Sequence, residues 1–399
     1  MEFSFTDEQL MIQETASGFL AEVSTSEAVR AAMVTELGYE PDVWKRVCED
    51  LFLHAVTIPE EFGGMGLGYV ELITIMERIG KHLFCSPYFS TVCLATNALL
   101  IAGTDEQKQT YFERIIAGET ATLAFNDASG TWGAESVSCA YTKQGDAFVL
   151  NGEYRHVVNG SSADFMVVAA REAGSVSEKG ISLFIVDAKA EGIQADVLPT
   201  VDQTRKLAHV TFSNVSVPAA ACMQSEAAAW PLLSTIIQLS TVCVAAEQTG
   251  GAQRVIDMSV EYMQERSQFN RPIASFQALK HKVADMQLKT EVATSAIYYA
   301  ACVAQEVLLG DAGDAVIASE LMEASSMAKA HCSDAYFYNA GSAIQLHGGV
   351  GFTWEYDVHL YFKRAKASQH FLGDATYHRE QIARVLLDSD RAYNEGELA

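Results

Sequence analysis

The strongest constraint on the fold is a pair of long helical patterns that meet at a sharp break. Apolar residues recur with helical spacing over residues 232–265 and again over residues 276–309. Pro272 lies between the two patterns and cannot continue a helix. Gly250-Gly251 is the expected weak point of the first helix. The alanine-rich spacing of the second favours close packing, so residues 230–399 are predicted to form a helical domain.

Two arginines flank this break. Arg266 and Arg271 carry planar guanidinium groups, whose forked donors match the oxygens of a pyrophosphate. Taken alone, the same pattern also fits a solvated helical hairpin with two surface arginines. The segment therefore indicates a nucleotide site only in combination with the other motifs below.

The middle of the chain changes to a period of two. Between residues 121 and 229, short runs rich in β-branched residues alternate with Gly, Asn and Asp turns. The runs cover residues 122–126, 136–142, 147–151, 164–170, 182–186, 195–199 and 209–212. This spacing predicts a β domain, a small antiparallel barrel or sandwich.

The first 120 residues are predicted to be helical. Thr6 and Thr104 are each followed three residues later by glutamine, which is the signature of a capping box. Further helices are expected at about 26–37, 41–53 and 69–81. The chain is thus divided into an N-terminal helical domain (1–120), a β domain (121–229) and a C-terminal helical domain (230–399).

Composition excludes several classes of function. The net charge of −24 disfavours binding to nucleic acid or to an anionic membrane. The eight cysteines include no Cys-x-x-Cys pair, which argues against a metal site or a disulfide scaffold. The acidic N-terminus does not resemble a secretory signal, and the longest uncharged run, residues 231–246, is short for a membrane span. We expect a cytoplasmic protein without a membrane span.

The segment from Arg266 to Gln277 resembles a motif of the flavin-dependent acyl-CoA dehydrogenases. That motif reads Arg-x-x-Phe-Gly-x-x-Ile-x-x-Phe-Gln and is followed by Ala-Asp-Met, which occurs here at residues 284–286. Asn270 replaces the glycine. The resemblance extends from about residue 5 to about residue 386. It implies an α+β multidomain fold: an N-terminal helical domain, a middle antiparallel β-barrel or sandwich, and a C-terminal four-helix bundle.

The resemblance also implies FAD as cofactor. Arg266, Phe269 and Gln277 match residues that contact the nucleotide, and Asp374 and Thr376 lie in a later segment that does so. The run Gln345, Leu346, His347, Gly348 and Gly349 matches a glycine-containing segment that contacts FAD held mainly by a neighbouring subunit. Glycines at a helix C-terminus also serve as ordinary helix caps.

Two segments of the β domain match the family more weakly. Asn126 and Ser129 lie in a loop where the family cradles flavin and substrate. His156 replaces a tryptophan that covers the flavin edge, and Val158 replaces a hydroxyl residue that binds the flavin ring. An ordinary β-turn explains the loop equally well, and a lone histidine in a strand, such as His156, more often has a structural role.

The family's catalytic base is missing. Removal of a proton next to a thioester needs a nearby carboxylate, and the two positions that supply it in the family are occupied here by Leu372 and Ser240. Glu247 and Asp374 are weak substitutes. Glu247 lies seven residues after Ser240, roughly 10 Å along the helix. The backbone N–H of Leu372 is nevertheless available to donate a hydrogen bond to a thioester oxygen.

This absence resembles the base-lacking subunits of bacterial heteromeric acyl-CoA dehydrogenases for steroid side chains. By that resemblance, the partners are a homologous base-bearing subunit, a bulky acyl-CoA and an electron-transfer flavoprotein. Three alternatives stay open. The chain is otherwise a self-sufficient homo-oligomer with an atypical base, a flavin monooxygenase of the same fold, or a non-catalytic subunit that completes an FAD site.

Overall fold

A computed structural model describes residues 6–176, 178–223, 228–310 and 315–388. The chain forms two compact units, each assembled from separate stretches of sequence. Unit 1 contains residues 1–28, 69–84 and 241–399, and unit 2 contains residues 29–68 and 85–240. Residues 1–5 and 389–399 of the two predicted outer domains lie outside the described residues.

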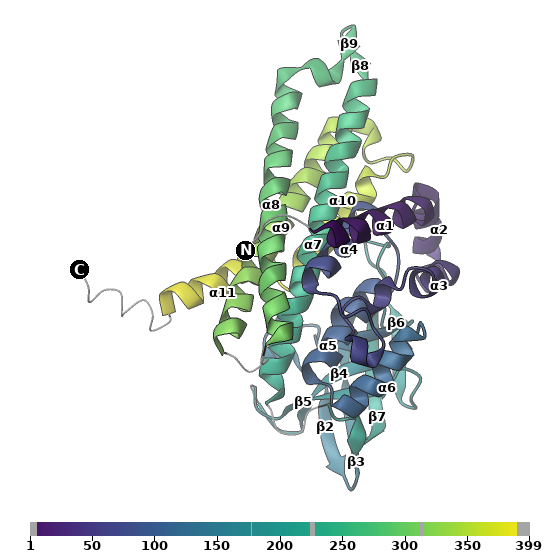
Figure 1. The fold of residues 1–399 in the computed structure, drawn as a ribbon, viewed down its shortest axis with the longest axis vertical. Helices are drawn as coiled ribbons and strands as arrows, with labels where there is room; N and C mark the ends of the chain where they lie inside the picture. The colour runs from purple at the N-terminus through teal and green to yellow at the C-terminus, as the bar shows by residue number, and fades with distance from the viewer. Residues whose placement is uncertain (1–5, 177, 224–227, 311–314, 389–399) are drawn as a thin grey trace, which may run out of the picture. The chain divides into compact units, whose positions relative to one another are not determined.

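Unit 1 is helical. Its longest elements are α8 (Gln277–Leu309), α9 (Ala315–His347) and the part of α7 (Ala229–Glu265) that follows residue 240. They are accompanied by α1 (Asp7–Val23), α4 (Tyr69–Lys81), α10 (Val358–His370) and α11 (Ala375–Asp388). Helices α7 and α8 run side by side and are joined by the small hairpin of β8 (Ser267–Gln268) and β9 (Arg271–Pro272) (Figure 1). The predicted break at Pro272 is confirmed as this hairpin.

Unit 2 combines short helices with a sheet. The helices α3 (Pro41–Glu49), α5 (Asn97–Ala102) and α6 (Asp105–Ile116) belong to it, and α2 (Ser26–Val34) begins in unit 1 and ends in unit 2. The capping boxes predicted at Thr6 and Thr104 are both formed. The predicted helices at 26–37 and 41–53 are shorter than expected and end at Val34 and Glu49.

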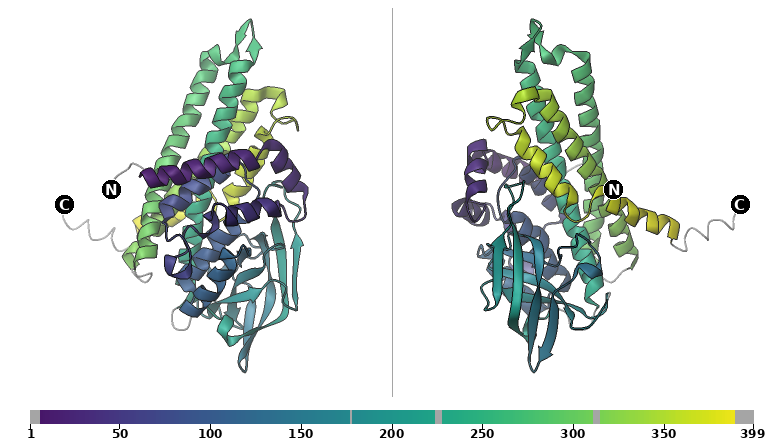
Figure 2. Two further views of the ribbon diagram at one scale, coloured as in Figure 1. Left: turned by 45° about the vertical axis from the view of Figure 1, so that its right-hand side comes forward. Right: turned by 180° about the vertical axis from the view of Figure 1, so that it is seen from behind.

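The seven predicted strands are all present and form one twisted sheet (Figure 2). They are β1 (Ala121–Ala124), β2 (Ala140–Gln144), β3 (Ala147–Val158), β4 (Phe165–Glu172), β5 (Ile181–Asp187), β6 (Ile193–Val197) and β7 (Leu207–Pro218). The order is β1-β4-β2-β3-β7-β6, with β5 paired to β4.

The expectation of a purely antiparallel sheet is wrong at two pairings. Strand β4 lies parallel to both β1 and β2, whereas the pairs β2–β3, β3–β7, β4–β5 and β6–β7 are antiparallel. Parallel neighbours need a long crossover connection. The residues between β1 and β4 supply it, because β2 and β3 form a hairpin within that stretch.

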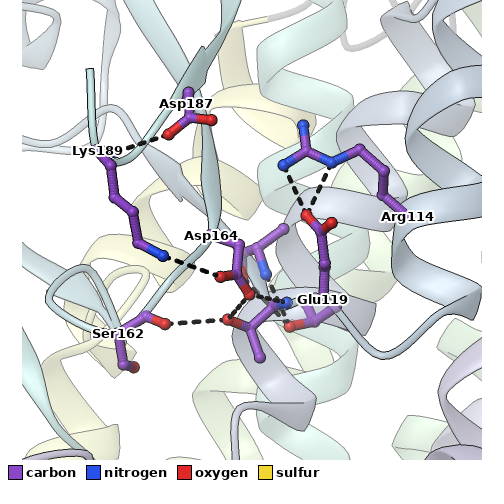
Figure 3. A network of polar contacts seen from close by, with 9 residues as sticks. Arg114, Glu119, Ser162, Asp164, Asp187 and Lys189 are labelled. Carbon is purple, nitrogen blue, oxygen red and sulfur yellow. Dashed lines mark hydrogen bonds and ion pairs between the residues drawn. The ribbon is translucent and has the colours of Figure 1, made fainter.

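A polar network in unit 2 fastens the end of α6 to the sheet (Figure 3). The Asp164 carboxylate accepts hydrogen bonds from the backbone N–H and the hydroxyl of Thr120, at 2.9 and 3.1 Å. The Arg114 guanidinium pairs with Glu119 at 2.6 Å, directly before Thr120. These contacts fix the chain where it enters β1, the strand that leads to the loop containing Asn126.

Helices α4 and α7 meet backbone to backbone in unit 1. A Cβ atom added at Gly80 would lie 1.9 Å from the carbonyl oxygen of Glu247, and one added at Gly250 would lie 1.8 Å from that of Glu77. Only glycine fits at either position. Gly250 was expected to weaken α7, but the helix continues through it, and the residue is needed for this close approach.

Two helices, α7 and α8, are long and apolar enough to cross a membrane by length and composition alone. In the most apolar stretch, 67% of α7 and 39% of α8 is buried within the protein. The core helix of a globular protein passes the same test, so this finding is weak support for a membrane span. The absence of a span stays a prediction.

We expect Gly250→Ala to lower the free energy of unfolding by about 1–3 kcal/mol, because the new methyl group must push α7 away from α4. Chemical denaturation measures the change. The matched control is Gly18→Ala on α1, where a Cβ has nothing within 4 Å. That variant should be stabilised by about 0.5–1 kcal/mol. Equal stability of the two variants would contradict the close contact.

Candidate functional site

The hairpin between α7 and α8 is exposed and left-handed at its tip. Phe269 has φ 53° and 86% of its side chain exposed, and Asn270 has φ 62°. Asparagine tolerates this conformation better than most residues, which explains how it replaces the glycine of the family motif. The Arg271 guanidinium lies over the Phe276 ring, 4.1 Å from its centroid, and is therefore partly committed to packing.

Arg266 and Gln277 are free to bind a ligand. Both side chains are exposed, and neither forms a hydrogen bond or ion pair with the residues that the structure describes. Gln277 is the first residue of α8, where backbone N–H groups at a helix start favour an anion. The two predicted nucleotide contacts thus provide donors at one end of unit 1.

The predicted glycine segment follows the C-terminus of α9. Gly348 has φ 63°, and a Cβ at Gly348 or Gly349 would have no atom within 4 Å. Both glycines are exposed, as is the Gln345 side chain, whereas Leu346 is buried against Ile256. The backbone at this helix end is consequently open to close approach by a ligand or a partner chain.

His347 joins this segment to the hairpin. Its ring stacks on Tyr262 with centroids 4.5 Å apart, and its Nδ1 lies 2.7 Å from the carbonyl oxygen of Ala343. Burial lowers the pKa of His347. Tyr262 lies one helical turn before Arg266, so the stack brings the end of α9 next to the end of α7. The His347 side chain acts here as packing, and any cofactor contact would come from backbone.

In unit 2, the loop after β1 holds an unsatisfied polar atom. The side-chain oxygen of Asn126 is buried and has no hydrogen-bond partner among the described residues. Its backbone carbonyl accepts a hydrogen bond of 3.0 Å from Arg155 N–H. Ser129 is exposed and closes a turn by donating its N–H to Asp127 at 2.7 Å. A buried carbonyl oxygen without a donor is costly, so Asn126 is the residue of this loop that calls for a ligand.

His156 lies on a β-bulge that the sequence pattern does not reveal. The pairing of β3 with β7 shifts register between Tyr154 and Val157, and His156 has φ 60°. Bulges redirect side chains and are common beside active sites. The ring is exposed, and partial desolvation together with Arg155 lowers its pKa. Val158, by contrast, is buried and accepts a hydrogen bond from Thr122 Oγ1 through its carbonyl, at 2.6 Å.

The turn between α10 and α11 contains Leu372 in a strained conformation. Leu372 has φ 57°, and only 1% of its side chain is exposed. A left-handed leucine costs about 1–3 kcal/mol, and such strain gathers at functional sites. Gly373 follows with φ 95°, and a Cβ there would lie 2.4 Å from the Tyr377 ring. The Leu372 N–H forms no hydrogen bond with the described residues.

Two buried basic residues, absent from the sequence predictions, contact this turn. Lys329 of α9 donates to the carbonyl oxygen of Gly373 at 2.8 Å, and His378 of α11 reaches that of Leu372 at 2.8 Å. Desolvation lowers the pKa of Lys329 to about 7 and that of His378 to about 3. A lysine in the middle of an apolar helical pattern was the one signal that sequence reading could have used.

The weak candidate bases have other partners. Glu247 forms a buried ion pair with Arg364, with 2.8 Å between carboxylate and guanidinium. Asp374 caps α11 by accepting the N–H of Tyr377 at 2.8 Å. Thr376, in the first turn of the same helix, is exposed. Both carboxylates are thus engaged in structural contacts, Glu247 with Arg364 and Asp374 with the start of α11.

The Ser240 hydroxyl hydrogen-bonds to a π-helix, a rare type of helix. Its hydroxyl lies 2.6 Å from the carbonyl oxygen of Cys93 in the π-helix η3 (Phe89–Thr96) and 2.7 Å from that of Ile236. A π-helix shifts carbonyls out of the regular hydrogen-bond pattern, and the side-chain amide of Asn97 also donates to Cys93, at 2.7 Å. The Ser240 side chain thus stabilises this helix from a fully buried position.

Glu77 of α4 is a further carboxylate that sequence reasoning missed. Desolvation raises its pKa to about 7, while Arg78 opposes that shift. The carboxylate forms no hydrogen bond or ion pair with the residues that the structure describes. A largely buried carboxyl group with this pKa is a candidate proton acceptor, although its neighbours Cys332 and Gly250 place it inside the helical unit.

Each unit, taken by itself, has features that fit an FAD cofactor. Arg266 and Gln277 offer uncommitted donors for phosphate oxygens, and Gly348-Gly349 leaves backbone open. The unpaired buried oxygen of Asn126 can accept from an N–H of the flavin ring. In the described part of the chain, no group of three or more His, Cys, Asp or Glu side chains could hold a metal ion.

Family models cover most of the chain. The acyl-CoA dehydrogenase N-terminal domain matches residues 6–119, the middle domain residues 126–215, and the C-terminal domain residues 230–387.

Individual relatives agree. "Acyl-CoA dehydrogenase IpdE2" of Mycolicibacterium smegmatis is 31% identical, over 95% of this chain and 98% of its own. "Acryloyl-CoA reductase (NADH)" of Anaerotignum propionicum is 29% identical, over 97% and 96%. A chain of the ChsE4-ChsE5 complex from Mycobacterium tuberculosis superposes with a TM-score of 0.85, at 26% identity, over 98% of this chain and all of that one. The chain belongs to the acyl-CoA dehydrogenase family, whose cofactor is FAD.

Proposed function

We propose that this chain is the base-lacking subunit of a heteromeric acyl-CoA dehydrogenase that acts on a bulky acyl-CoA, such as one derived from a steroid. A homologous subunit supplies the carboxylate base, and an electron-transfer flavoprotein in the cytoplasm reoxidises the cofactor. The observation that carries the proposal is the Leu372 turn. It has the backbone strain of a functional site, with an apolar side chain where the family has its base.

The proposal is supported by the other contacts of the groups considered as replacements for the base. Glu247 is neutralised by Arg364, and Asp374 is a helix cap. Ser240, at the alternative position, bonds a π-helix carbonyl. With these groups occupied, a carboxylate from another chain is the simplest source of the proton acceptor. Glu77, whose pKa is raised by desolvation, keeps a self-sufficient enzyme open as the alternative.

The similarities support the acyl-CoA dehydrogenase activity and the heteromer. The IpdE2 proteins are named as acyl-CoA dehydrogenases, and the superposed mycobacterial structure is itself a complex of two different proteins. The similar acryloyl-CoA reductase works with NADH, so the reaction direction of this chain is part of the proposal. We place it on the dehydrogenation side because two relatives, 31% and 32% identical, carry the dehydrogenase name.

The residues of this chain would have three tasks in the reaction. Arg266, Gln277 and the Gly348-Gly349 backbone bind the nucleotide part of FAD. The chemistry that bound FAD would supply is a hydride acceptor for the β carbon of the acyl group. The Leu372 N–H donates to the thioester oxygen, where negative charge develops as the α proton leaves. The buried Leu372 side chain keeps water from this position.

We expect the isolated wild-type chain, loaded with FAD, to be reduced very slowly by acyl-CoA, since a general base contributes about 10²–10⁴-fold. Anaerobic bleaching of the flavin absorbance measures this with short, long and steroidal thioesters. Leu372→Glu should accelerate bleaching, and so should addition of the base-bearing partner.

Two alternatives are tested with the same FAD-loaded chain. NADH in place of acyl-CoA tests the reductase, and oxygen consumption by the reduced flavin tests the monooxygenase.

Rapid bleaching of the isolated wild-type chain would overturn the base-lacking assignment. Glu77→Gln, Glu247→Gln and Asp374→Asn would then identify the base, as the variant that keeps its flavin and loses activity. A chain that never retains FAD, alone or with its partner, would instead point to a scaffold role.

Arg266→Ala should reduce FAD retention, because a charge-assisted contact to phosphate contributes roughly 1.5–3 kcal/mol. The flavin-to-protein ratio after serial dilution reports the loss. Arg384→Ala is the matched control, since Arg384 is an exposed arginine that pairs with Glu380 one turn away on α11. Identical flavin ratios in the two variants would remove Arg266 from the cofactor site.

The protein should form a dimer or larger assembly, homomeric or heteromeric. Helix α8 exposes Leu288 by 65% and Val292 by 47%, an apolar face that a second subunit would cover. Light scattering after size exclusion should show dissociation of Leu288→Glu, while Leu387→Glu on the exposed end of α11 stays assembled. A wild-type monomer that retains stoichiometric FAD would contradict the prediction.

A further inference from the structure

Lys329 is fully buried and uses all of its hydrogen-bonding capacity at one place. Its amine donates to the Gly373 carbonyl at 2.8 Å, to the Gln369 carbonyl at 3.2 Å and to the Ser333 hydroxyl at 3.0 Å. Gln369 lies in the last turn of α10, and Gly373 lies in the turn that follows. One side chain from α9 therefore ties the end of α10 to the turn that contains Leu372.

His378 holds the same turn from the other side. Its Nε2 lies 2.8 Å from the Leu372 carbonyl oxygen, and its Nδ1 lies 3.2 Å from the Ser326 hydroxyl. Burial lowers the pKa of His378 to about 3, so the ring is neutral. The neutral ring must carry its proton on Nε2 to donate to Leu372, and Nδ1 then accepts from Ser326.

We propose that Lys329 and His378 are positioning residues, which hold the strained Leu372-Gly373 turn so that the Leu372 N–H stays available to a thioester oxygen. Both residues hydrogen-bond to carbonyl oxygens of the turn. The Leu372 N–H has no hydrogen-bond partner among the described residues. This inference rests on the proposed function, since it assigns a support to the donor used there.

The contacts explain how the strain is maintained. A left-handed leucine relaxes readily unless its surroundings fix it, and two buried donors on consecutive carbonyls provide such constraints. These hydrogen bonds can form whether the Lys329 amine is charged or neutral. A neutral amine still donates to Gln369 and Gly373 and accepts from Ser333, whose hydroxyl otherwise donates to the Gln248 side chain at 3.2 Å.

The test compares two ligands that differ only at the carbonyl. Hexanoyl-CoA and S-hexyl-CoA, in which a CH₂ replaces the thioester carbonyl, are titrated calorimetrically into the FAD-loaded full chain. Their affinity ratio isolates the interaction with the carbonyl. In Lys329→Met, the preference for the thioester should fall roughly threefold to tenfold, the size of one hydrogen bond. The affinity for S-hexyl-CoA and the flavin ratio should not change.

Variants of His378 give a second, independent measurement. His378→Phe should lose the thioester preference, and His378→Gln should retain it, because the glutamine amide can still donate to the Leu372 carbonyl. Lys366→Met is the matched control, an exposed lysine on α10 whose amine contacts the Gln369 side chain rather than the turn. Its thioester preference should equal that of the wild type.

The outcomes separate the two levels of the argument. Retained thioester preference in both Lys329→Met and His378→Phe would overturn the positioning role and leave the proposed function intact. Equal weakening of both ligands would show that the residues only support the fold. A wild-type chain without any thioester preference would remove the donor role of Leu372, and the positioning role with it.

Discussion

Helix α7 can approach α4 closely because each helix presents a glycine to the other's backbone. Gly80 faces the carbonyl of Glu247, and Gly250 faces that of Glu77. This spacing leaves no room for a methyl group between them. The same close packing fixes the backbone at Glu247 and Glu77, the residues that carry the two buried carboxyl groups. Glu247 forms an ion pair with Arg364, whereas the Glu77 carboxylate has no hydrogen bond with the described residues.

Much of the fold could be read from the sequence because its signals are local. The capping boxes at Thr6 and Thr104, the break at Pro272 and the seven alternating segments each depend on nearby residues. The parallel pairings of β4 could not be read in this way, since they are decided by which distant strands meet. The domain boundaries drawn from composition stay a prediction, because the compact units combine separated stretches of chain.

The candidate site likewise contains residues that the sequence could indicate and residues that only the fold brings together. Motif positions such as Arg266 and Gln277 could be proposed from the resemblance to a family motif, and the structure shows them exposed and uncommitted. The residues that hydrogen-bond to the Leu372-Gly373 turn could not be proposed from the sequence. Lys329 and His378 lie 43 and 6 residues from Leu372, and only the fold brings both to it. Likewise, the left-handed conformation of His156 arises from a register shift between strands and leaves no mark in the pattern.

The Leu372 turn separates backbone from side chain in a way that matters for evolution. Its shape depends on Gly373 and on donors from α9 and α11, none of which involves the side chain at position 372. A lineage can therefore exchange a carboxylate for an apolar group there without rebuilding the surrounding helices. Gene duplication followed by one such exchange would be enough to divide labour between two subunits, and the ancestral arrangement would remain within reach of a single residue.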